Sequence, residues 1–340
     1  MSPMHRAVLL LAHGTPNVLG EMAEYLSKVT GGRALPYEVV EELKHRYAQI
    51  GLKETPGDEP PHLTKWTLAQ GHALEQMLGG TRVYIAMRNW SPYVADVVAQ
   101  MRADGVEKIR AICLAPQNSR TSVGLYRRAL MAAATGLEVE FVADWAEDLL
   151  LVEAFAERLE PAWTAACMET GTRVPVLFTA HSVPCRTIMT GEASVVGARP
   201  GTPAQDTPDP YPVEAKRTAA LVAERLRGAG LTEQDWYFAF QSQGVSGGPW
   251  IGPTVEDTLK ALKEEGHAGV VMQPVGFVCD HVEVLYDIDI AFRQLASEIG
   301  LKLWRAESLN DSLTLTQALA GIATSEALPE AAEAVPAKVG

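Results

Sequence analysis

Cysteine is scarce in this 340-residue chain, and the few that occur form no metal or redox motif. They are too far apart to make a CxxC pair and stand at Cys113, Cys167, Cys185 and Cys279. A zinc knuckle and a thioredoxin-type site both need closely spaced cysteines, so both are excluded. Scattered cysteines without an export signal are typical of the reducing cytoplasm, which is the predicted location.

Positive charge and long apolar runs are also lacking. The 29 Lys and Arg residues are outnumbered by 42 Asp and Glu, which gives a formal net charge of −13, and no basic block stands out. Nucleic acids and anionic membrane surfaces attract clustered cations, so neither is a predicted partner. No apolar run approaches the roughly 18 residues of a membrane span, so no integral membrane contact is expected.

The usual nucleotide-binding spacings are absent as well. The chain contains neither GxGxxG after its first predicted strand nor GxxxxGK[ST] anywhere. Both spacings build backbone cradles for phosphate groups. Chemistry on a small ligand without a nucleotide cofactor therefore fits better than hydride or phosphoryl transfer.

Short apolar runs alternate with amphipathic stretches along the chain, which is the α/β pattern of parallel sheets covered by helices. Two series of strands are predicted, at 7–12, 82–87, 109–114 and 138–142, and at 175–179, 236–240, 269–273 and 302–305. Helices are predicted between them, for example at 94–103, 146–159, 214–227 and 254–265. Gly171 and Pro175 interrupt the helical pattern between the two series, which predicts a boundary there.

The two series begin alike. Residues 8–16 read VLLLAHGTP and residues 176–184 read VLFTAHSVP, so each apolar strand is followed by A-H-[GS]-x-P. His13 and His181 are 168 residues apart and occupy the same place in this pseudo-repeat. Ligands of parallel sheets bind beyond the carboxyl ends of the strands. Either histidine alone fits a buried structural role, but two at equivalent positions favour a shared site for a proton or a metal ion.

The most informative stretch is PVGFVCDHVEVLYDID at 274–289, a strand end that continues into a predicted helix. Glu283 and Asp287 are four residues apart and share one helical face. Such an acidic ladder suits a hydrated divalent cation or a proton path, and a solvated acidic face at a helix start is the alternative. His281 is two residues from Glu283, so we expect it to point elsewhere and to serve capping or packing.

Taken together, these motifs resemble those of the ferrochelatases, which insert Fe²⁺ into a porphyrin. The resemblance extends from residue 9 to about residue 320. Its segments are AHSVP at 180–184, DPYP at 209–212, FQS at 240–242, PWIGP at 249–253, PVGFVCDHVEVLYD at 274–287 and LNDS at 309–312. The motif at 274–287 is the most specific of these.

The resemblance implies a fold of two Rossmann-like domains, each a parallel sheet flanked by helices, with the porphyrin in an interdomain cleft. Combined with the break between the two series, it predicts domains at 4–168 and 172–308. The helix at 310–323 is expected to pack back on the first domain. Residues 324–340 are rich in Ala, Glu and Pro, which predicts a disordered tail.

The resemblance also implies the site. His181 and Glu283 would be the catalytic pair at the pyrrole nitrogens, and Asp287 would extend the acidic line, so these three are the predicted metal-binding residues. Fe²⁺ is then a substrate, and no tightly bound cofactor is expected. Some relatives carry a [2Fe–2S] cluster held partly by C-terminal cysteines. No cysteine follows Cys279 in this chain, so we expect no cluster.

Several segments are closest to the coproporphyrin III ferrochelatases of Gram-positive-type bacteria: LAPQNS at 114–119, YRR at 126–128 and DHVEVLYD at 280–287. By this resemblance the substrate is coproporphyrin III, whose four propionates call for cations and hydroxyls. The predicted substrate-binding residues are His13, Thr30, Arg46, Tyr47 and Tyr126. Further candidates for propionates are Arg33, Arg88 and Arg120, and Trp90 and Tyr126 are candidates for the cavity wall or for plain core packing.

The chain departs from that branch at two of these positions. His13 stands where the relatives have Tyr, and Thr30 stands where they have a basic residue. The alternatives therefore remain a protoporphyrin IX ferrochelatase, or less closely a sirohydrochlorin chelatase, and a non-catalytic haem- or porphyrin-binding carrier with His13 as axial ligand. A monomer is expected in each case.

Overall fold

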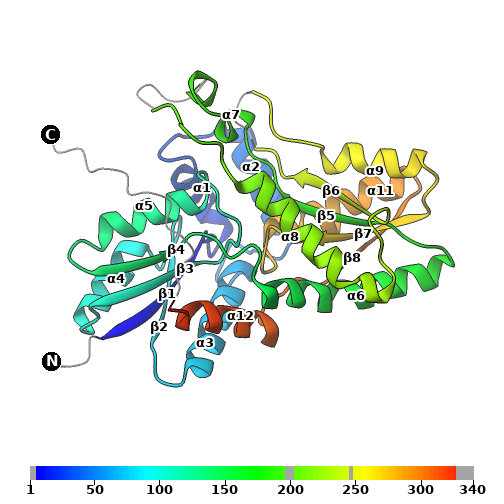
Figure 1. Ribbon diagram of the computed structural model, residues 1–340. Helices are drawn as coiled ribbons and strands as arrows, with labels where there is room; N and C mark the ends of the chain where they lie inside the picture. Colours follow the sequence, from blue (N-terminus) through cyan, green and yellow to red (C-terminus); the bar gives the residue numbers. More distant parts are fainter. Residues whose placement is uncertain (1–4, 196–202, 245–247, 327–340) are drawn as a thin grey trace.

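The computed structural model describes residues 5–195, 203–244 and 248–326, and within them the chain forms two four-stranded parallel sheets (Figure 1). The first sheet has the order β2-β1-β3-β4 and the second the order β6-β5-β7-β8. The strands are β1 (Arg6–Ala12), β2 (Val83–Met87), β3 (Lys108–Cys113), β4 (Glu138–Val142), β5 (Val176–His181), β6 (Trp236–Gln241), β7 (Gly269–Pro274) and β8 (Lys302–Arg305).

The two sheets share one topology, so the α/β prediction and its pseudo-repeat are confirmed. In each sheet the first strand of the series pairs with the second on one side and with the third on the other. The eight predicted strands all occur, with ends displaced by at most two residues. The central strands β1 and β7 are buried along almost their whole length, which is why they read as continuous apolar runs.

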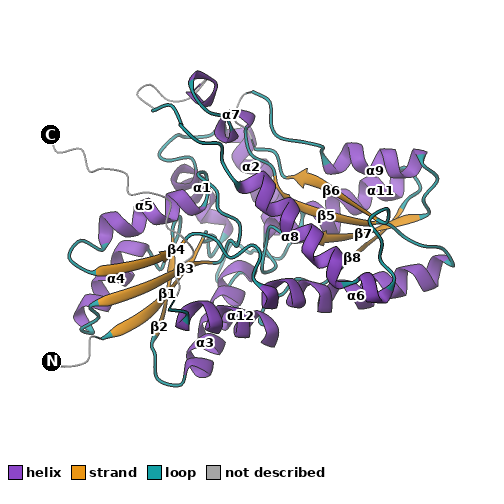
Figure 2. Cartoon of the chain, viewed as in Figure 1, coloured by secondary structure: helices purple, strands orange, loops and turns teal. Residues whose placement is uncertain are grey.

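Helices flank both sheets, as Figure 2 shows in purple around the orange strands. The helices of the first half are α1 (Met22–Val29), α2 (Tyr37–Gln49), α3 (His62–Leu78), α4 (Val94–Ala103), α5 (Val123–Ala133) and α6 (Leu149–Thr170). Those of the second half are α7 (Cys185–Ile188), α8 (Tyr211–Arg225), α9 (Val255–Glu264), α10 (Val282–Leu285), α11 (Arg293–Glu298) and α12 (Leu313–Thr324). None of the helices in the described ranges combines the length and the apolar character that a bilayer crossing requires.

The long helix α6 packs differently from what the sequence division suggests. Asp148 caps its N-terminus by accepting from two backbone N–H groups, and Gly171 ends it with a left-handed φ of +66°. The helix spans 22 residues, more than the predicted 146–159, and it packs against β7, β8 and α8 of the second half. Its residues, assigned by sequence to the domain 4–168, thus cover the second sheet.

Helix α12 follows the last strand of the second sheet, yet it packs on the first half of the molecule. It packs against α3 and β3 of the first half and also against α6, and in Figure 1 its red ribbon lies beside α3. Arg110 of β3 donates to the backbone carbonyl of Ser325 just beyond this helix. The two halves are therefore joined by exchanged helices. The predicted tail at 324–340 begins at the end of α12, and 327–340 lie outside the described residues.

Candidate active site

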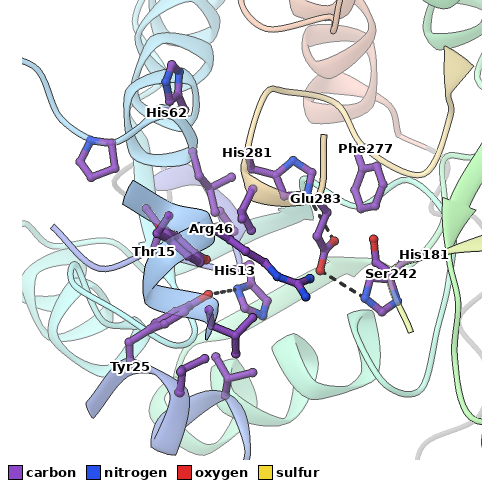
Figure 3. Close-up of a pocket in the computed structure, with 18 of the residues that line it drawn as sticks. His13, Thr15, Tyr25, Arg46, His62, His181, Ser242, Phe277, His281 and Glu283 are labelled. Atoms are coloured by element: carbon purple, nitrogen blue, oxygen red, sulfur yellow. Dashed lines mark hydrogen bonds and ion pairs between the residues drawn. The ribbon is translucent and has the colours of Figure 1, made fainter. Parts of the chain in front are cut away.

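A cavity of about 1210 Å³ lies at the carboxyl ends of the central strands, and residues of both halves line it. His13 follows β1, His181 ends β5, and Glu283 and Asp287 follow β7, as expected for a site beyond parallel strands. All the site residues predicted from the sequence line this one cavity: His13, Thr30, Arg46, Tyr47, Tyr126, His181, Glu283 and Asp287. Figure 3 shows the two histidines entering it from different sides.

His181 and Glu283 form the central pair of the cavity. The Nε2 atom of His181 lies 3.2 Å from Oε1 of Glu283, and both side chains are about one-third exposed (Figure 3). The other ring nitrogen, Nδ1, is hydrogen-bonded to the carbonyl of Ser182. The hydroxyl of Tyr211 donates to the carbonyl of His181 at 2.9 Å and so fixes the backbone behind the ring. The imidazole is therefore held in one orientation, toward the carboxylate.

The charges of this pair are set by competition between burial and attraction. Burial alone would lower the pKa of His181 and raise that of Glu283. Their mutual attraction and hydrogen bond prevail, so the pKa of His181 is raised to about 9. The pKa of Glu283 is held well below its usual value by His181, with a further contribution from His281. At neutral pH the pair is an imidazolium and a carboxylate.

His281 does not point away from Glu283, so this prediction was wrong. Its Nε2 lies 3.4 Å from Oε2 of Glu283, while its Nδ1 is 3.0 Å from the carbonyl of Cys279. The ring also packs against Phe277, with centroids 4.6 Å apart. The prediction assumed helical spacing, but the backbone of His281 is extended (φ −159°, ψ −174°), and α10 begins only at the next residue. The carboxylate therefore has one imidazole at each oxygen.

Asp287 is a further carboxylate of the cavity, at the start of a π-helical segment, Asp287–Phe292. Burial raises its pKa to about 6, opposed by a hydrogen bond from Ser242 and reinforced by the charge of Glu283. Ser242 follows β6 and donates its hydroxyl to Asp287 from a left-handed backbone conformation, φ +62°. Such a backbone is rare for a residue other than glycine and is found mainly at functional sites.

Gln241, next to Ser242, ties the acidic helix to the sheet. Its amide nitrogen donates to the backbone carbonyl of Glu283 at 2.6 Å, and its amide oxygen accepts from the hydroxyl of Thr179 on β5 at 2.7 Å. The motif FQS at 240–242 signalled these two residues, but sequence alone gave them no role. In the structure they set the position of Glu283 and the ionisation of Asp287.

His13 has a different environment from its counterpart His181. Its Nδ1 lies 3.1 Å from the carbonyl of Gly14 and 3.2 Å from the hydroxyl of Tyr25. Its Nε2 lies 2.9 Å from the amide nitrogen of Asn89. Burial, and then the positive charge of Arg88, lower its pKa to about 4. His13 is therefore neutral, with both ring nitrogens engaged by the protein itself.

Arg46 connects the two halves across the cavity. It is carried by α2, pairs with Glu42 at 3.0 Å, and lies over the ring of Tyr286 at 5.1 Å. Figure 3 shows its side chain extending from α2 toward the middle of the cavity, between His13 and Glu283. A planar cation placed there can bind a carboxylate with two parallel hydrogen bonds.

The remaining predicted substrate-binding residues differ in their burial and in their hydrogen-bond partners. Tyr47 is buried and Tyr126 is buried on α5, and both line the cavity. The hydroxyl of Thr30 donates to the carbonyl groups at the end of α1, at 2.9 Å from Leu26 and 3.1 Å from Ser27. It therefore closes the helix as well as facing the cavity.

Two residues considered for this site lie outside it. Arg120 donates to the backbone carbonyls of Thr187 and Thr207, so it holds the segment after β5 instead of lining the cavity. Trp90 is buried with Tyr25, with ring centroids 6.1 Å apart, and belongs to the core. The segment 185–212, predicted as a loop, contains α7 and a short 3₁₀ helix, Glu192–Val195, while its residues 196–202 lie outside the described ranges.

Comparisons with known proteins show the family of this chain. The family model described as Ferrochelatase matches residues 5–327. A protein of Acidobacterium capsulatum named Ferrochelatase is 56% identical over 321 residues, which cover 94% of each chain. A protein of Geobacillus thermodenitrificans named Coproporphyrin III ferrochelatase is 32% identical and covers 93% of this chain and 94% of its own.

A solved structure supports the fold independently. The sirohydrochlorin chelatase SirB from Bacillus subtilis subspecies spizizenii, in complex with cobalt, superposes with a TM-score of 0.53 over 93% of this chain and 92% of its own. Only 10% of the residues are identical, so this likeness concerns the two-domain chelatase fold alone. With the family match across the chain and the relatives above, the protein belongs to the ferrochelatase family, the enzymes that insert iron into porphyrins.

Proposed function

We propose that this ferrochelatase inserts Fe²⁺ into coproporphyrin III, with His181 and Glu283 as its catalytic pair. The observation that carries the proposal is the 3.2 Å contact between these two side chains inside a cavity built by both halves. Metal insertion releases two pyrrole N–H protons, so a proton acceptor and a carboxylate are needed at the same point. Both groups also bind Fe²⁺, because imidazole and carboxylate are ordinary ligands of that ion.

The charge state of the pair constrains the order of events. The imidazolium of His181 has no lone pair at Nε2, so it must lose its proton before it binds Fe²⁺ or accepts a pyrrole proton. The approach of a divalent cation favours that loss, since it competes with the proton for the same negative charge of Glu283. Asp287, with a pKa of about 6, is the neighbouring carboxylate suited to receive the proton and pass it on.

The metal would be held only in passing. Within the described residues, no group of three or more His, Cys, Asp or Glu side chains is arranged to hold a metal ion. His181 and Glu283 supply two ligands and leave the remaining positions of the iron to water and then to the pyrrole nitrogens. This fits an ion that is delivered to the porphyrin.

Coproporphyrin III is supported by the polar groups around the cavity. Arg46, Tyr47 and Thr30 lie on the α1–α2 side, while Tyr126 lies on α5. A porphyrin with a propionate on every pyrrole ring could use the polar groups of both regions, whereas protoporphyrin IX carries propionates on two rings only. Relatives at about 32% identity are named coproporphyrin III ferrochelatases, and the 56% relative is named only ferrochelatase. Protoporphyrin IX is therefore the alternative substrate.

A non-catalytic haem carrier is less well supported. A carrier with His13 as axial ligand needs a free imidazole nitrogen, but both nitrogens of His13 have protein partners. A carrier also has no use for an ionic His–Glu pair in the binding cavity. We further propose that the enzyme works as a monomer in the cytoplasm, which size-exclusion chromatography coupled to light scattering and cell fractionation would test.

The deciding experiment is anaerobic Fe²⁺ insertion, followed by the loss of porphyrin fluorescence, with coproporphyrin III and protoporphyrin IX run in parallel. We expect wild type to prefer coproporphyrin III and His181→Ala to be inactive. The matched control is His267→Ala, which removes a histidine 3.6 Å from Glu265 outside the cavity and should keep full activity. Preference for protoporphyrin IX would overturn the substrate, and tight haem binding without insertion would favour the carrier.

A further inference from the structure

Arg88 differs from the other cations of the cavity. Five Lys and Arg residues of the described chain line it: Arg33, Arg46, Lys53, Lys65 and Arg88. Two of them have carboxylate partners, Arg46 with Glu42 at 3.0 Å and Lys65 with Glu59 at 2.6 Å. Arg33 and Lys53 are exposed to solvent. Arg88 is only partly exposed, and no carboxylate oxygen of the described residues lies within 4.0 Å of its guanidinium.

The backbone places Arg88 deep in the cavity. It follows β2 directly, and its N–H donates to the carbonyl of Ala12 at 3.0 Å, so it lies beside His13 at the ends of neighbouring strands. Its Nε is fully buried and has no hydrogen-bond partner among the described residues. The sheet thus fixes the backbone from which the Arg88 side chain enters the cavity.

The groups around Arg88 do not neutralise it. Its guanidinium lies over the ring of Tyr126, 5.7 Å from the centroid, and its other close neighbour, His13, is a neutral imidazole. The cavity wall formed by the start of α5 and the segment before it is rich in hydroxyls, from Ser119, Thr121, Ser122 and Tyr126. These hydroxyls and the guanidinium are hydrogen-bond donors, and together they suit an anion.

A partly buried guanidinium without a counter-ion is unfavourable, because burial removes water without supplying an opposite charge. A ligand that brings the missing charge would offset that cost. Burial also lowers the pKa of Arg88, although the group remains charged at neutral pH. A ligand carboxylate at this point would supply the missing negative charge. It could also accept two parallel hydrogen bonds from the guanidinium.

We propose that Arg88 binds a propionate on the porphyrin edge that faces α5, and that it thereby selects a porphyrin carrying a carboxylate on that edge. The proposal rests on the proposed function, since it takes the ligand to be a porphyrin. With its two neighbouring propionates toward Arg46, coproporphyrin III still carries propionates on its other two pyrrole rings. Protoporphyrin IX, bound with its two propionates toward Arg46, presents a vinyl group. Arg88 is therefore a specificity-determining residue.

The test is equilibrium binding of metal-free porphyrins, measured by quenching of protein fluorescence, for wild type and Arg88→Met. We expect coproporphyrin III to bind roughly 10–100-fold more weakly to the variant, the loss typical of one charge-assisted pair in a partly buried site. Protoporphyrin IX should lose less than about threefold. Arg88→Lys should recover part of the affinity for coproporphyrin III, since it keeps the charge but not the fork.

The matched control is Arg82→Met, at the start of the same strand region, where the arginine is exposed and paired with Asp104. It should leave both affinities unchanged. The melting temperature of Arg88→Met should be measured as well, to check that the variant is folded at the temperature of the binding experiment. Equal losses for the two porphyrins, or no loss for coproporphyrin III, would overturn the proposal.

Binding without iron also separates this proposal from the function on which it rests. If wild type binds coproporphyrin III in an Arg88-dependent way but inserts no Fe²⁺, the assigned reaction fails and the role of Arg88 stands. If wild type inserts iron and Arg88→Met keeps its preference for coproporphyrin III, the reaction stands and the role of Arg88 fails. If wild type binds neither porphyrin, both are wrong.

Discussion

The amide nitrogen of Asn89 lies 2.9 Å from Nε2 of His13, so the ring nitrogen left without a proton already accepts a hydrogen bond. With Nδ1 facing the carbonyl of Gly14 at 3.1 Å, the protein fixes both the tautomer and the orientation of the ring. His13 therefore stands in the cavity as a neutral, fully engaged imidazole. A metal ion on that side of the cavity would therefore have to displace one of these partners before it could bind the ring.

Freeing His13 should create an iron ligand. In Asn89→Ala the lone pair of Nε2 becomes available, while burial and Arg88 still keep the imidazole neutral. We expect the iron porphyrin product to be retained longer and to show the absorption spectrum of a histidine-bound haem. The double variant Asn89→Ala/His13→Ala should abolish that spectrum. A product spectrum identical to that of wild type would contradict this role of Asn89.

Removing the carboxylate of the central pair should change both rate and titration. In Glu283→Gln we expect kcat to fall by about 10²–10⁴-fold, the usual contribution of a positioned proton-transfer group. The pKa of His181 should fall from about 9, because the charge that most strongly opposes the effect of burial is removed. NMR titration of the imidazole in the metal-free protein measures this shift. An unchanged titration would show that Glu283 is not the partner that sets it.

The same pair makes stability depend on pH. The pKa of His181 is raised from 6.5, so its contribution is complete below pH 6.5 and is lost as pH rises through about 9. The pKa of Glu283 is lowered from 4.5, so its contribution is present above pH 4.5 and is lost on further acidification. The difference in melting temperature between wild type and Glu283→Gln should thus be largest between pH 4.5 and 6.5. A constant difference from pH 4 to 10 would argue against an ionic pair.

Ser242 should set the acid limit of the reaction. The hydrogen bond from its hydroxyl lowers the pKa of Asp287, which burial nevertheless raises to about 6. Ser242→Gly removes the donor and suits the left-handed backbone at φ +62°. We expect the acid limb of kcat, measured between pH 5 and 8, to move to higher pH. In Asp287→Asn that limb should disappear while the overall rate falls; a limb at the wild-type position in either variant would refute the assignment.

Arg305 should affect the site indirectly, because it holds the segment that carries Glu283 and Asp287. It holds Asp289 with two contacts of 2.8 Å and lies 3.5 Å from Asp280, so one guanidinium joins the two ends of the segment containing Glu283. The pair is only partly buried, so we expect Arg305→Ala to lose about 1–3 kcal/mol of stability, less than the loss of one partner of a fully buried pair. Its kcat should fall while the KM for porphyrin stays near the wild-type value.

Arg293 offers a matched control. It pairs with the same Asp289 at 3.5 Å but is more than half exposed, so Arg293→Ala should change neither stability nor kcat appreciably. Denaturant unfolding and steady-state kinetics on both variants make the comparison. Equal effects of the two substitutions would show that Arg305 is only one of several surface charges around Asp289.

The sequence was sufficient to predict the strands and the meeting point of the site. The apolar runs before His13 and His181 identify strands, and parallel pairing then brings both strand ends to one edge. The sequence could not predict which sheet α6 covers, because an amphipathic helix does not specify the surface against which its apolar face packs. The contact of His281 with Glu283 was missed because one extended residue precedes α10. The left-handed Ser242 carries no local signal that distinguishes it from an ordinary strand end.

The repeated topology has a consequence for how the two histidines came to differ. His13 and His181 occupy equivalent ends of equivalent strands, so the backbone alone treats them alike. Their neighbours do not: one ring is surrounded by an amide, a phenol and a cation, the other faces a carboxylate. Because both copies belong to one chain, equivalent strand ends can carry different neighbours. One side of the cavity thus presents a neutral imidazole held by hydrogen bonds, and the other presents a charged His–Glu pair.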